Sequence, residues 1–213
     1  MTIKEINAKI MSDEKFVLRE LDTLITYYQL KHTMRWAHTR TEDETESVAE
    51  HIYGMHILID YFYPLIAETE PLNLETIRHL ATWHDMAEAF VGDMPTRTKT
   101  DEHKQDEKQA EAEIVKNAPA HLATLLKDVF AELDVRLTRE AAFVKAIDKI
   151  EPNVHLYFLS QKEKDYAQYL DLGWTAEAYR TYREPYMSPF PLIQKFDEVL
   201  YVKSKETNFF PLE

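Results

Sequence analysis

The chain contains no cysteine, and this absence removes a whole class of sites. Disulfides and thiolate metal ligands are excluded, so any metal site must use nitrogen and oxygen donors. Glycine is also scarce, with 3 among 213 residues, and runs of Val, Ile and Thr that alternate with polar residues are few. Because tight hairpins consume glycine and half-buried strands need that alternation, the composition favours helices over a sheet.

Positive charge and long apolar runs are in short supply as well. Lys and Arg number 25 against 38 Asp and Glu, a net charge of −13, and no basic patch interrupts the acidic surface. Such a chain repels a nucleic-acid polymer, whereas a small phosphorylated substrate stays compatible because one metal ion and one arginine outweigh a remote field. No run approaches the roughly 18–20 apolar residues of a membrane span, and no signal-peptide core opens the sequence. We therefore expect a cytoplasmic protein without a membrane partner.

Apolar residues at helical spacing are what the sequence has in their place. Ser47 and Glu50 form a capping box before a helix expected to run to about Tyr61, and Asn73 caps a helix expected to continue to Gly92. The same reasoning predicts further helices at about 15–30, 101–118, 121–134 and 138–151, the last of them stopping before Pro152. Residues 31–47, polar and rich in Thr and Glu, are predicted to be a loop. The expected fold class is all-α.

A few ionisable residues fall within the apolar faces of these helices. His51 faces inward near the start of its helix, His84 and Asp85 are adjacent in an apolar pattern, and Asp148 follows a buried isoleucine. Buried ionisable groups need a partner or a metal ion. Two imidazoles and two carboxylates suit Mn, Fe, Co, Ni or Zn as divalent ions, and Mg less clearly.

Each of these residues also has an ordinary structural explanation. An inward histidine such as His51 is more often a hydrogen-bonded core residue than a ligand. Asp148 is three residues from Lys145 and next to Lys149, so it could simply pair with either. Arg35, in the polar segment, could be a solvated surface charge. The residues alone leave these alternatives open.

Taken in order, the candidates resemble a known motif. His51, the pair His84-Asp85 and the distant Asp148 match the pattern of the HD-domain phosphohydrolase superfamily over roughly residues 30–155. The resemblance implies a single-domain helical bundle of the HD type over residues 1–213, with a motif-bearing core of about 30–155. Residues from about 155 to 213 would form a C-terminal helical extension, which carries no motif that can be matched.

Further residues narrow the resemblance to one branch. Arg35-Trp36 upstream of SVAEH, and HDMAEAFVGDMPT with Glu88 and Asp93, look like the 5′-deoxynucleotidase branch, the YfbR-like and HD-domain-containing protein 2-like group. This similarity implies one divalent metal ion as cofactor, a nucleoside monophosphate as substrate and a homodimer as the assembly.

The resemblance also implies a role for each matching residue. The metal ligands would be His51, His84, Asp85 and Asp148, and the two aspartates would contact the substrate as well. Glu88 would be the general acid or base, and Arg35 would orient the phosphate through bidentate contacts. The sugar and the rest of the nucleotide would meet Trp36, which crowds C2′ and favours deoxyribose, and the loop residues Asp93 and Thr96.

The expected function is therefore that of a hydrolase, a 5′-nucleotidase that releases phosphate from (deoxy)nucleoside 5′-monophosphates with a metal-activated water. One alternative keeps the fold and the metal but acts on another phosphorylated metabolite or a pyrophosphate ester. Ala89 disfavours the stringent-response hydrolases, which resemble this fold with Glu-Asp at Glu88-Ala89, and the absence of a Gly-Tyr-Pro motif disfavours cyclic dinucleotide phosphodiesterases. The other alternative is a metal-binding helical regulatory module without turnover.

Overall fold

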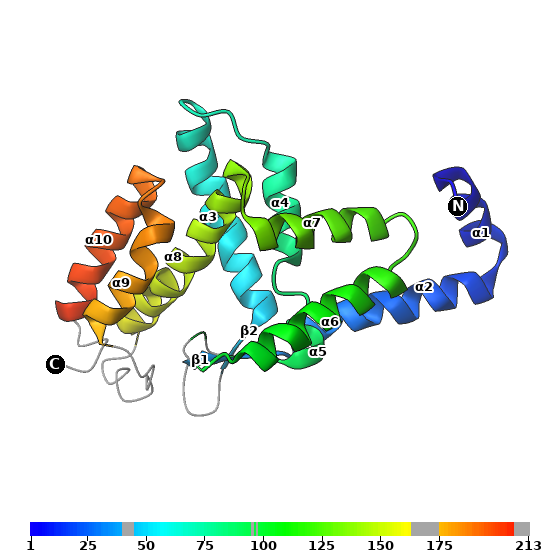
Figure 1. The fold of residues 1–213 in the computed structure, drawn as a ribbon, viewed down its shortest axis with the longest axis horizontal. Coiled ribbons are helices and arrows are strands. Elements are labelled where there is room, and N and C mark those ends of the chain that lie inside the picture. The colour runs from blue at the N-terminus through cyan, green and yellow to red at the C-terminus, as the bar shows by residue number, and fades with distance from the viewer. Residues whose placement is uncertain (40–44, 95, 97, 163–174, 207–213) are drawn as a thin grey trace.

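Helices make up nearly all of the fold (Figure 1). The computed structural model describes residues 1–39, 45–94, 96, 98–162 and 175–206. The helices are α1 (Ile3–Ser12), α2 (Glu14–Tyr27), α3 (Val48–Ala67), α4 (Leu74–Trp83), α5 (Glu88–Val91), α6 (Asp101–Asn117), α7 (Ala123–Val135), α8 (Arg139–Lys162), α9 (Ala176–Met187) and α10 (Pro191–Glu206). A short 3₁₀ helix, η1 (Tyr28–Lys31), follows α2. The all-α prediction is confirmed, with one small sheet added.

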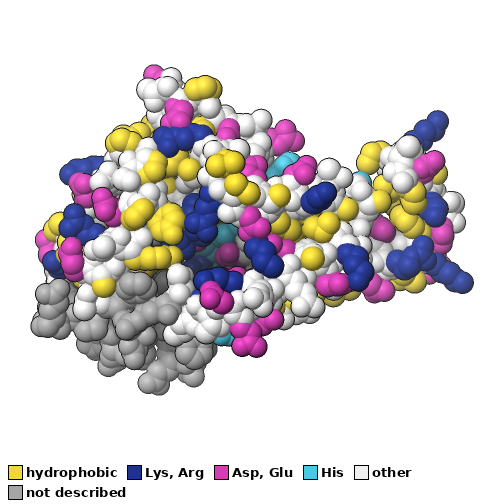
Figure 2. Space-filling model, viewed as in Figure 1, with side chains coloured by type: hydrophobic (Ala, Val, Ile, Leu, Met, Phe, Trp, Pro, Cys, Tyr) yellow, Lys and Arg dark blue, Asp and Glu magenta, His cyan; other side chains and the backbone are white. Residues whose placement is uncertain are grey.

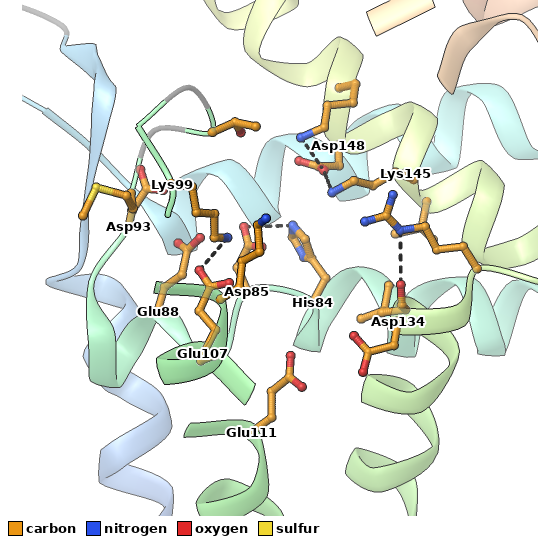
Figure 3. A pocket seen from close by; sticks show the side chains of 18 of the residues that line it. His84, Asp85, Glu88, Asp93, Lys99, Glu107, Glu111, Asp134, Lys145 and Asp148 are labelled. Carbon is orange, nitrogen blue, oxygen red and sulfur yellow. Dashed lines mark hydrogen bonds and ion pairs between the residues drawn. The ribbon is translucent and has the colours of Figure 1, made fainter. Parts of the chain in front are cut away.

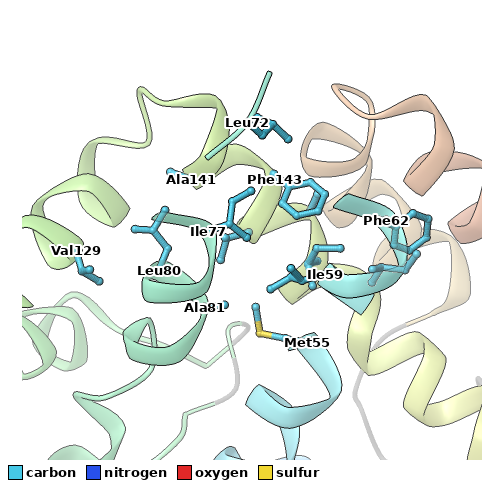
Figure 4. Close-up of a cluster of buried hydrophobic side chains, with 14 of the residues drawn as sticks. Met55, Ile59, Phe62, Leu72, Ile77, Leu80, Ala81, Val129, Ala141 and Phe143 are labelled. Atoms are coloured by element: carbon cyan, nitrogen blue, oxygen red, sulfur yellow. The ribbon is translucent and has the colours of Figure 1, made fainter. Parts of the chain in front are cut away.

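The hydrophobic core lies where α3, α4 and α8 pack together, with α7 and α10 closing its sides. Figure 4 shows side chains of these helices converging, among them Met55 and Phe62 from α3, Leu80 from α4 and Phe143 from α8. All four are 0 % exposed, so each contributes on the order of 1.5–3 kcal/mol of transfer free energy. This packing fixes α3, α4 and α8 relative to one another, and these are the helices that carry or adjoin the candidate ligands.

The predicted caps begin the helices where expected. At the start of α3, the Ser47 amide donates to Oε2 of Glu50 at 2.8 Å, and the Glu50 amide donates to Oγ of Ser47 at 3.3 Å. At the start of α4, the Thr76 amide donates to Oδ1 of Asn73 at 3.0 Å. Each cap satisfies backbone donors that a helix leaves unpaired at its first turn.

The prediction of a loop over residues 31–47 was wrong. Strand β1 (Met34–Thr39) pairs antiparallel with β2 (Thr45–Ser47), and Met34 lies opposite Ser47. Threonine is β-branched and fits a strand as readily as a turn, and the polar composition concealed this preference. The Val48 amide donates to the Thr33 carbonyl at 2.9 Å, which ties the start of α3 to the beginning of β1. Residues 40–44 lie outside the described part.

Two helices are longer than predicted, and each contains a proline. The helix predicted to end near Tyr61 extends to Ala67 with Pro64 in its last turns, and α8 continues through Pro152 to Lys162. A proline removes one backbone donor and crowds the preceding turn, at a cost of about 3 kcal/mol in a helix interior. Buried side chains on both sides of Pro152, such as Ile150 and Leu156, offset that cost by packing.

Among the residues that the structure describes, no helix is both long enough and apolar enough to cross a membrane.

A buried polar cluster attaches α9 and α10 to α8. Arg183 of α9 lies 2.9 Å from Oδ1 of Asp197 of α10 and donates to Oδ1 of Asn153 of α8 at 3.1 Å. Asn153 in turn donates to Asp197 at 2.9 Å, and the Arg183 guanidinium lies over the Tyr179 ring. Arg183 and Asp197 are 2 % and 5 % exposed. Each charge is therefore compensated by the other in a dry environment.

Replacing Asp197→Ala should lower the free energy of unfolding by about 3–5 kcal/mol, because it leaves the buried Arg183 charge without its partner. Urea unfolding followed by circular dichroism measures this. Glu198→Ala is the matched control, since its pair with Lys195 is exposed and should change stability by less than about 1 kcal/mol. Equal effects of the two variants would show that the buried cluster does not hold α9 and α10 in place.

Candidate metal centre

The first ligand candidate, His51, is held by a carboxylate from α8. His51 is 0 % exposed, and its Nδ1 lies 2.6 Å from Oε2 of Glu151. An ionised carboxylate only accepts, so Nδ1 carries the proton and Nε2 faces the other way, 3.4 Å from Oδ1 of Asp148. Burial and Arg35 work to lower the pKa of His51, but Glu151 and Asp148 outweigh them and raise it to about 9. A cation that binds Nε2 therefore displaces a proton.

Gly54 makes room for this carboxylate. A Cβ at Gly54 would collide with Oε1 of Glu151 and would lie 3.1 Å from its Cδ. Gly54 lies three residues after His51 on α3, so the backbone of one helical turn faces the carboxylate that orients the imidazole. Any larger side chain at this position must displace Glu151 from His51.

The second and third candidates, His84 and Asp85, lie where α4 ends. The prediction of one helix from Asn73 to Gly92 was wrong here, since α4 stops at Trp83 and α5 restarts at Glu88. Between them the amides bond three residues back in place of four, for example from Glu88 to the Asp85 carbonyl at 3.0 Å. This tighter winding changes the direction of the side chains relative to a continuous α-helix. Gly92, with φ of 80°, ends α5 as expected of glycine.

His84 is oriented by its own backbone. Its Nδ1 lies 2.9 Å from the Ala81 carbonyl, which accepts the Nδ1 proton, and its Nε2 lies 2.9 Å from Oδ2 of Asp85. The His84 and His51 rings have their centroids 5.6 Å apart. Burial opposes ionisation of Asp85, but His84 outweighs it and holds the pKa of Asp85 below its usual range.

The fourth candidate, Asp148, divides its two oxygens between the centre and two lysines. Oδ1 faces His51, while Oδ2 lies 2.6 Å from Nζ of Lys145 and 3.2 Å from Nζ of Lys149 (Figure 3). Burial opposes ionisation, but both lysines outweigh it and hold the pKa of Asp148 well below its usual range. Asp148 therefore pairs with both lysines, the alternative that the sequence left open, and it also approaches His51.

The four side chains leave donor atoms that a cation would satisfy. One ligand atom each from His51, His84 and Asp85 lie within 4.8 Å of one another, and Asp148 joins them through His51. Nε2 of His51 and Nε2 of His84 are buried and face aspartate oxygens at 3.4 and 2.9 Å without hydrogen-bond geometry, an arrangement that a cation bound between nitrogen and oxygen would satisfy. Two imidazole nitrogens and one carboxylate this close together, with a second carboxylate next to His51, fit a divalent metal ion.

A cavity of about 460 Å³ opens onto this centre. Figure 2 shows its mouth as a hollow in which basic side chains surround deeper histidine and acidic side chains. Its lining includes the predicted catalytic residues Glu88 and Arg35 and the predicted nucleotide-contacting residues Asp93 and Thr96. The side chain of Trp36 lies outside the described residues. His84, Asp85 and Asp148 also line this cavity, whereas His51 is buried behind it and does not line it.

Glu88 is the carboxyl of this cavity whose environment most favours a bound proton. Burial, and then the charges of Asp85 and Asp93, raise the pKa of Glu88 well above its usual value. A carboxyl with a raised pKa is better suited than an ordinary one to donate a proton to a departing group. Figure 3 shows Glu88 on the same side of the cavity as Asp93.

Arg35 reaches the cavity from β1. Its Nε is 3.8 Å from Oε2 of Glu46, too far for a hydrogen bond, and within the described residues neither Nε nor Nη1 has a hydrogen-bond partner. Burial and the charge of Glu151 raise the pKa of Glu46 to about 7, although Arg35 counteracts them. Arg35 therefore presents buried donors in a cavity next to the candidate ligands.

Several residues of the site were missed at the level of sequence. Glu151 lies three residues after Asp148, so helical spacing alone could have placed it on the same side of α8. Lys145 and Lys149 were considered only as partners of Asp148. Tyr182 and Tyr186 of α9 also line the cavity, and no signal in the sequence connected them with a centre formed some 35 residues earlier in the chain.

We expect Gly54→Ala to weaken metal binding by roughly 10- to 100-fold, because the new Cβ displaces Glu151 and frees the His51 ring to turn. Isothermal titration of the metal-free protein with Mn²⁺ or Co²⁺ measures the affinity. Glu151→Gln should weaken binding in the same direction. Asp60→Ala, at an exposed position of the same helix in a pair with the exposed Arg78, is the matched control. Unchanged affinity in both variants would exclude Glu151 as the residue that orients His51.

The sequence matches a known protein family and several of its named members. An HD domain family model matches residues 27–182. The fission yeast (Schizosaccharomyces pombe) 5′-deoxynucleotidase hdd1 is 32 % identical over 156 residues, which are 68 % of this chain and 76 % of that protein. The Xenopus laevis 5′-deoxynucleotidase HDDC2 is 34 % identical over 128 residues, 58 % of this chain and 60 % of that protein. The match therefore spans less than two thirds of the HDDC2 relative's length.

The fold itself matches a solved structure. A "predicted metal-dependent phosphohydrolase" from Magnetospirillum magnetotacticum MS-1 superposes with a TM-score of 0.74, covering 91 % of this chain and 95 % of that one at 18 % sequence identity. At this identity the likeness concerns the fold alone. The family model covers well over half of the chain, and the His, His-Asp and Asp residues of the motif occur in the expected order. The chain belongs to the HD domain family.

Proposed function

We propose that the protein is a metal-dependent 5′-nucleotidase that hydrolyses deoxynucleoside 5′-monophosphates to nucleoside and phosphate. The observation that carries the proposal is the cluster of His51, His84 and Asp85 donors, with Oδ1 of Asp148 3.4 Å from Nε2 of His51, beside a cavity that Glu88 and Arg35 line. The names of the curated relatives support the same substrate class. When bound, a divalent ion would supply Lewis acidity at a phosphoryl oxygen and a lowered water pKa.

We assign Glu88 as the general acid that protonates the leaving group. Hydrolysis joins a water oxygen to phosphorus and breaks the bond from phosphorus to O5′, so the departing O5′ must gain a proton. Glu88 lines the cavity and has a raised pKa, which suits the donor of that proton. After donation, its carboxylate can take up a proton from the next water.

We assign Arg35 as a donor of hydrogen bonds to the phosphate oxygens of the substrate. A guanidinium presents its N–H donors in a planar fork that matches two oxygens of a phosphate. In the described structure Arg35 has buried donors without hydrogen-bond partners, and an anion would satisfy them. Its contact with Glu46 is an ion pair at 3.8 Å, which keeps the side chain in place and leaves the donors available.

The remaining assignments concern the nucleoside and the metal. Asp93 and Thr96 line the cavity beside Glu88, and we assign them contacts to the nucleotide. Trp36, next to Arg35 in β1, is assigned to crowd C2′ of the sugar and favour deoxyribose. Donors of nitrogen and oxygen only suit Mn, Co, Fe, Ni or Zn, with Mg less suited.

The assembly is proposed to be a homodimer. On α3 the exposed apolar side chains Tyr53, Ile57, Tyr61 and Leu65 follow one another every four residues. Exposed apolar residues of α10 adjoin them, and the Tyr61 and Phe196 rings lie 5.6 Å apart. A contiguous apolar patch of this kind is typical of a subunit interface.

A panel of substrates tests the activity. With Mn²⁺ or Co²⁺, we expect phosphate release from 5′-dNMPs to exceed release from 5′-NMPs, because the site is assigned to a deoxyribose. Phosphate release in a colorimetric assay measures both, with p-nitrophenyl phosphate as a generic ester. Release only from other phosphate or pyrophosphate esters would replace the nucleotide substrate. No release with any bound metal would instead indicate a regulatory module.

Glu88→Gln tests the proton assignment. The amide keeps the shape but holds no transferable proton, so kcat should fall by roughly 10²–10⁴-fold. The affinity for Mn²⁺, measured by titration, should stay close to that of the unsubstituted protein, since Glu88 is not assigned as a ligand. Glu113→Gln, on the exposed side of α6, is the matched control. An unchanged kcat would remove Glu88 from the mechanism.

A further inference from the structure

Two lysines of α8 end on the same oxygen of Asp148. Lys145 and Lys149 lie 2.6 and 3.2 Å from Oδ2, and both line the cavity. Their side chains are 25 % and 16 % exposed, so neither is a freely solvated surface lysine. Figure 3 shows Lys145 meeting Asp148 beside His84 and Asp85. One carboxylate thus serves two cations and faces the metal centre as well.

Once a divalent cation binds beside Asp148, the positive charges of Lys145 and Lys149 are no longer balanced by the carboxylates of the ligand set. Asp85 and Asp148 are the carboxylates of the ligand set, and together they balance one divalent ion. The histidine ligands are then neutral at the coordinating nitrogen. Lys145 and Lys149 remain as two positive charges in a mostly buried position, which is costly without an anion. A phosphate dianion in the cavity has the matching charge.

The two lysines differ in how firmly Asp148 holds them. Lys145 donates a short hydrogen bond to Oδ2, at 2.6 Å. Lys149 is farther away, and within the described residues Asp148 is the one carboxylate within ion-pair distance of it. On its other side Lys149 lies 5.7 Å from the centroid of the Tyr182 ring, a face that attracts a cation but accepts no strong hydrogen bond. An ammonium has three donors, and these neighbours use few of them.

We propose that Lys149 binds a phosphate oxygen of the substrate, with Lys145 as the positioning residue that keeps Asp148 oriented. This inference rests on the proposed function for the identity of the ligand. It gives the phosphate a second cationic contact, from α8, in addition to Arg35 from β1. It also gives α8 two tasks at the centre, since the same helix supplies Asp148 and the group that meets its anionic ligand.

Inorganic phosphate binding to the Mn²⁺-saturated full-length protein tests the assignment. Lys149→Met should weaken phosphate binding by roughly 10- to 100-fold, the range for a lost charge-assisted hydrogen bond, while Lys149→Arg restores most of it. Mn²⁺ affinity, titrated separately, should be unchanged or tighter in Lys149→Met, because a cation beside Asp148 has been removed. Lys116→Met, an exposed lysine of a helical Lys–Glu pair outside the cavity, is the matched control.

A purely structural role of Lys149 predicts the reverse effects on Mn²⁺ affinity and on phosphate binding. If Lys149 only holds Asp148 in place, Lys149→Met lowers Mn²⁺ affinity and leaves phosphate binding at saturating Mn²⁺ unchanged, and this outcome overturns the proposal. Thermal melts establish that each variant is folded, with Lys149→Gln replacing the methionine variant if that one is not. Because binding is measured without turnover, a wild-type protein that binds phosphate through Lys149 but hydrolyses no nucleotide would contradict the proposed function alone.

Discussion

The packing of α3 against α8 is the constraint on which the rest of the site depends. It places Glu151 beside His51 at 2.6 Å and Asp148 on the other side of the same imidazole at 3.4 Å. Both contacts require a close approach of the helices, and Gly54 permits it because a Cβ there would occupy the space of the Glu151 carboxylate. One helix crossing therefore sets the tautomer of a ligand, its orientation and its distance from a second ligand.

The charge of the cavity wall is mixed, in contrast to the strongly acidic net charge of the whole chain. The protein carries a net charge of −13, yet its cavity wall alternates acids with Arg35, Lys145 and Lys149. Low solvent exposure strengthens each of these interactions relative to the surface. The result is a division of carboxyl groups, since the lysines hold the pKa of Asp148 low while burial and neighbouring acids raise that of Glu88. Two carboxyls in one cavity are thereby suited to different tasks, one to bind a cation and one to carry a proton.

Much of this could be predicted from the sequence where a local rule decides the outcome. The caps at Ser47 and Asn73 and the inward face of His51 follow from spacing and short-range hydrogen bonding. The break after Trp83 could not be predicted in this way, because the apolar pattern continues through His84 to Glu88 while the backbone tightens. Glu151 was overlooked although its spacing from Asp148 places both residues on one side of α8, and the β1–β2 hairpin was overlooked because threonine suits loops and strands alike.

Pro152 shows why the C-terminal helices belong to the site. A proline directly after Glu151, which lies 2.6 Å from Nδ1 of His51, would be expected to end α8, and the chain beyond it would then be an appendage. In the structure α8 continues, and Asn153, directly after the proline, hydrogen-bonds to Arg183 and Asp197. That buried cluster fixes α9 against α8, and α9 presents Tyr182 to the cavity next to Lys149. The cost of a proline inside α8 is thus borne by packing that also completes the cavity wall, so the metal centre and the C-terminal helices are parts of one structural unit.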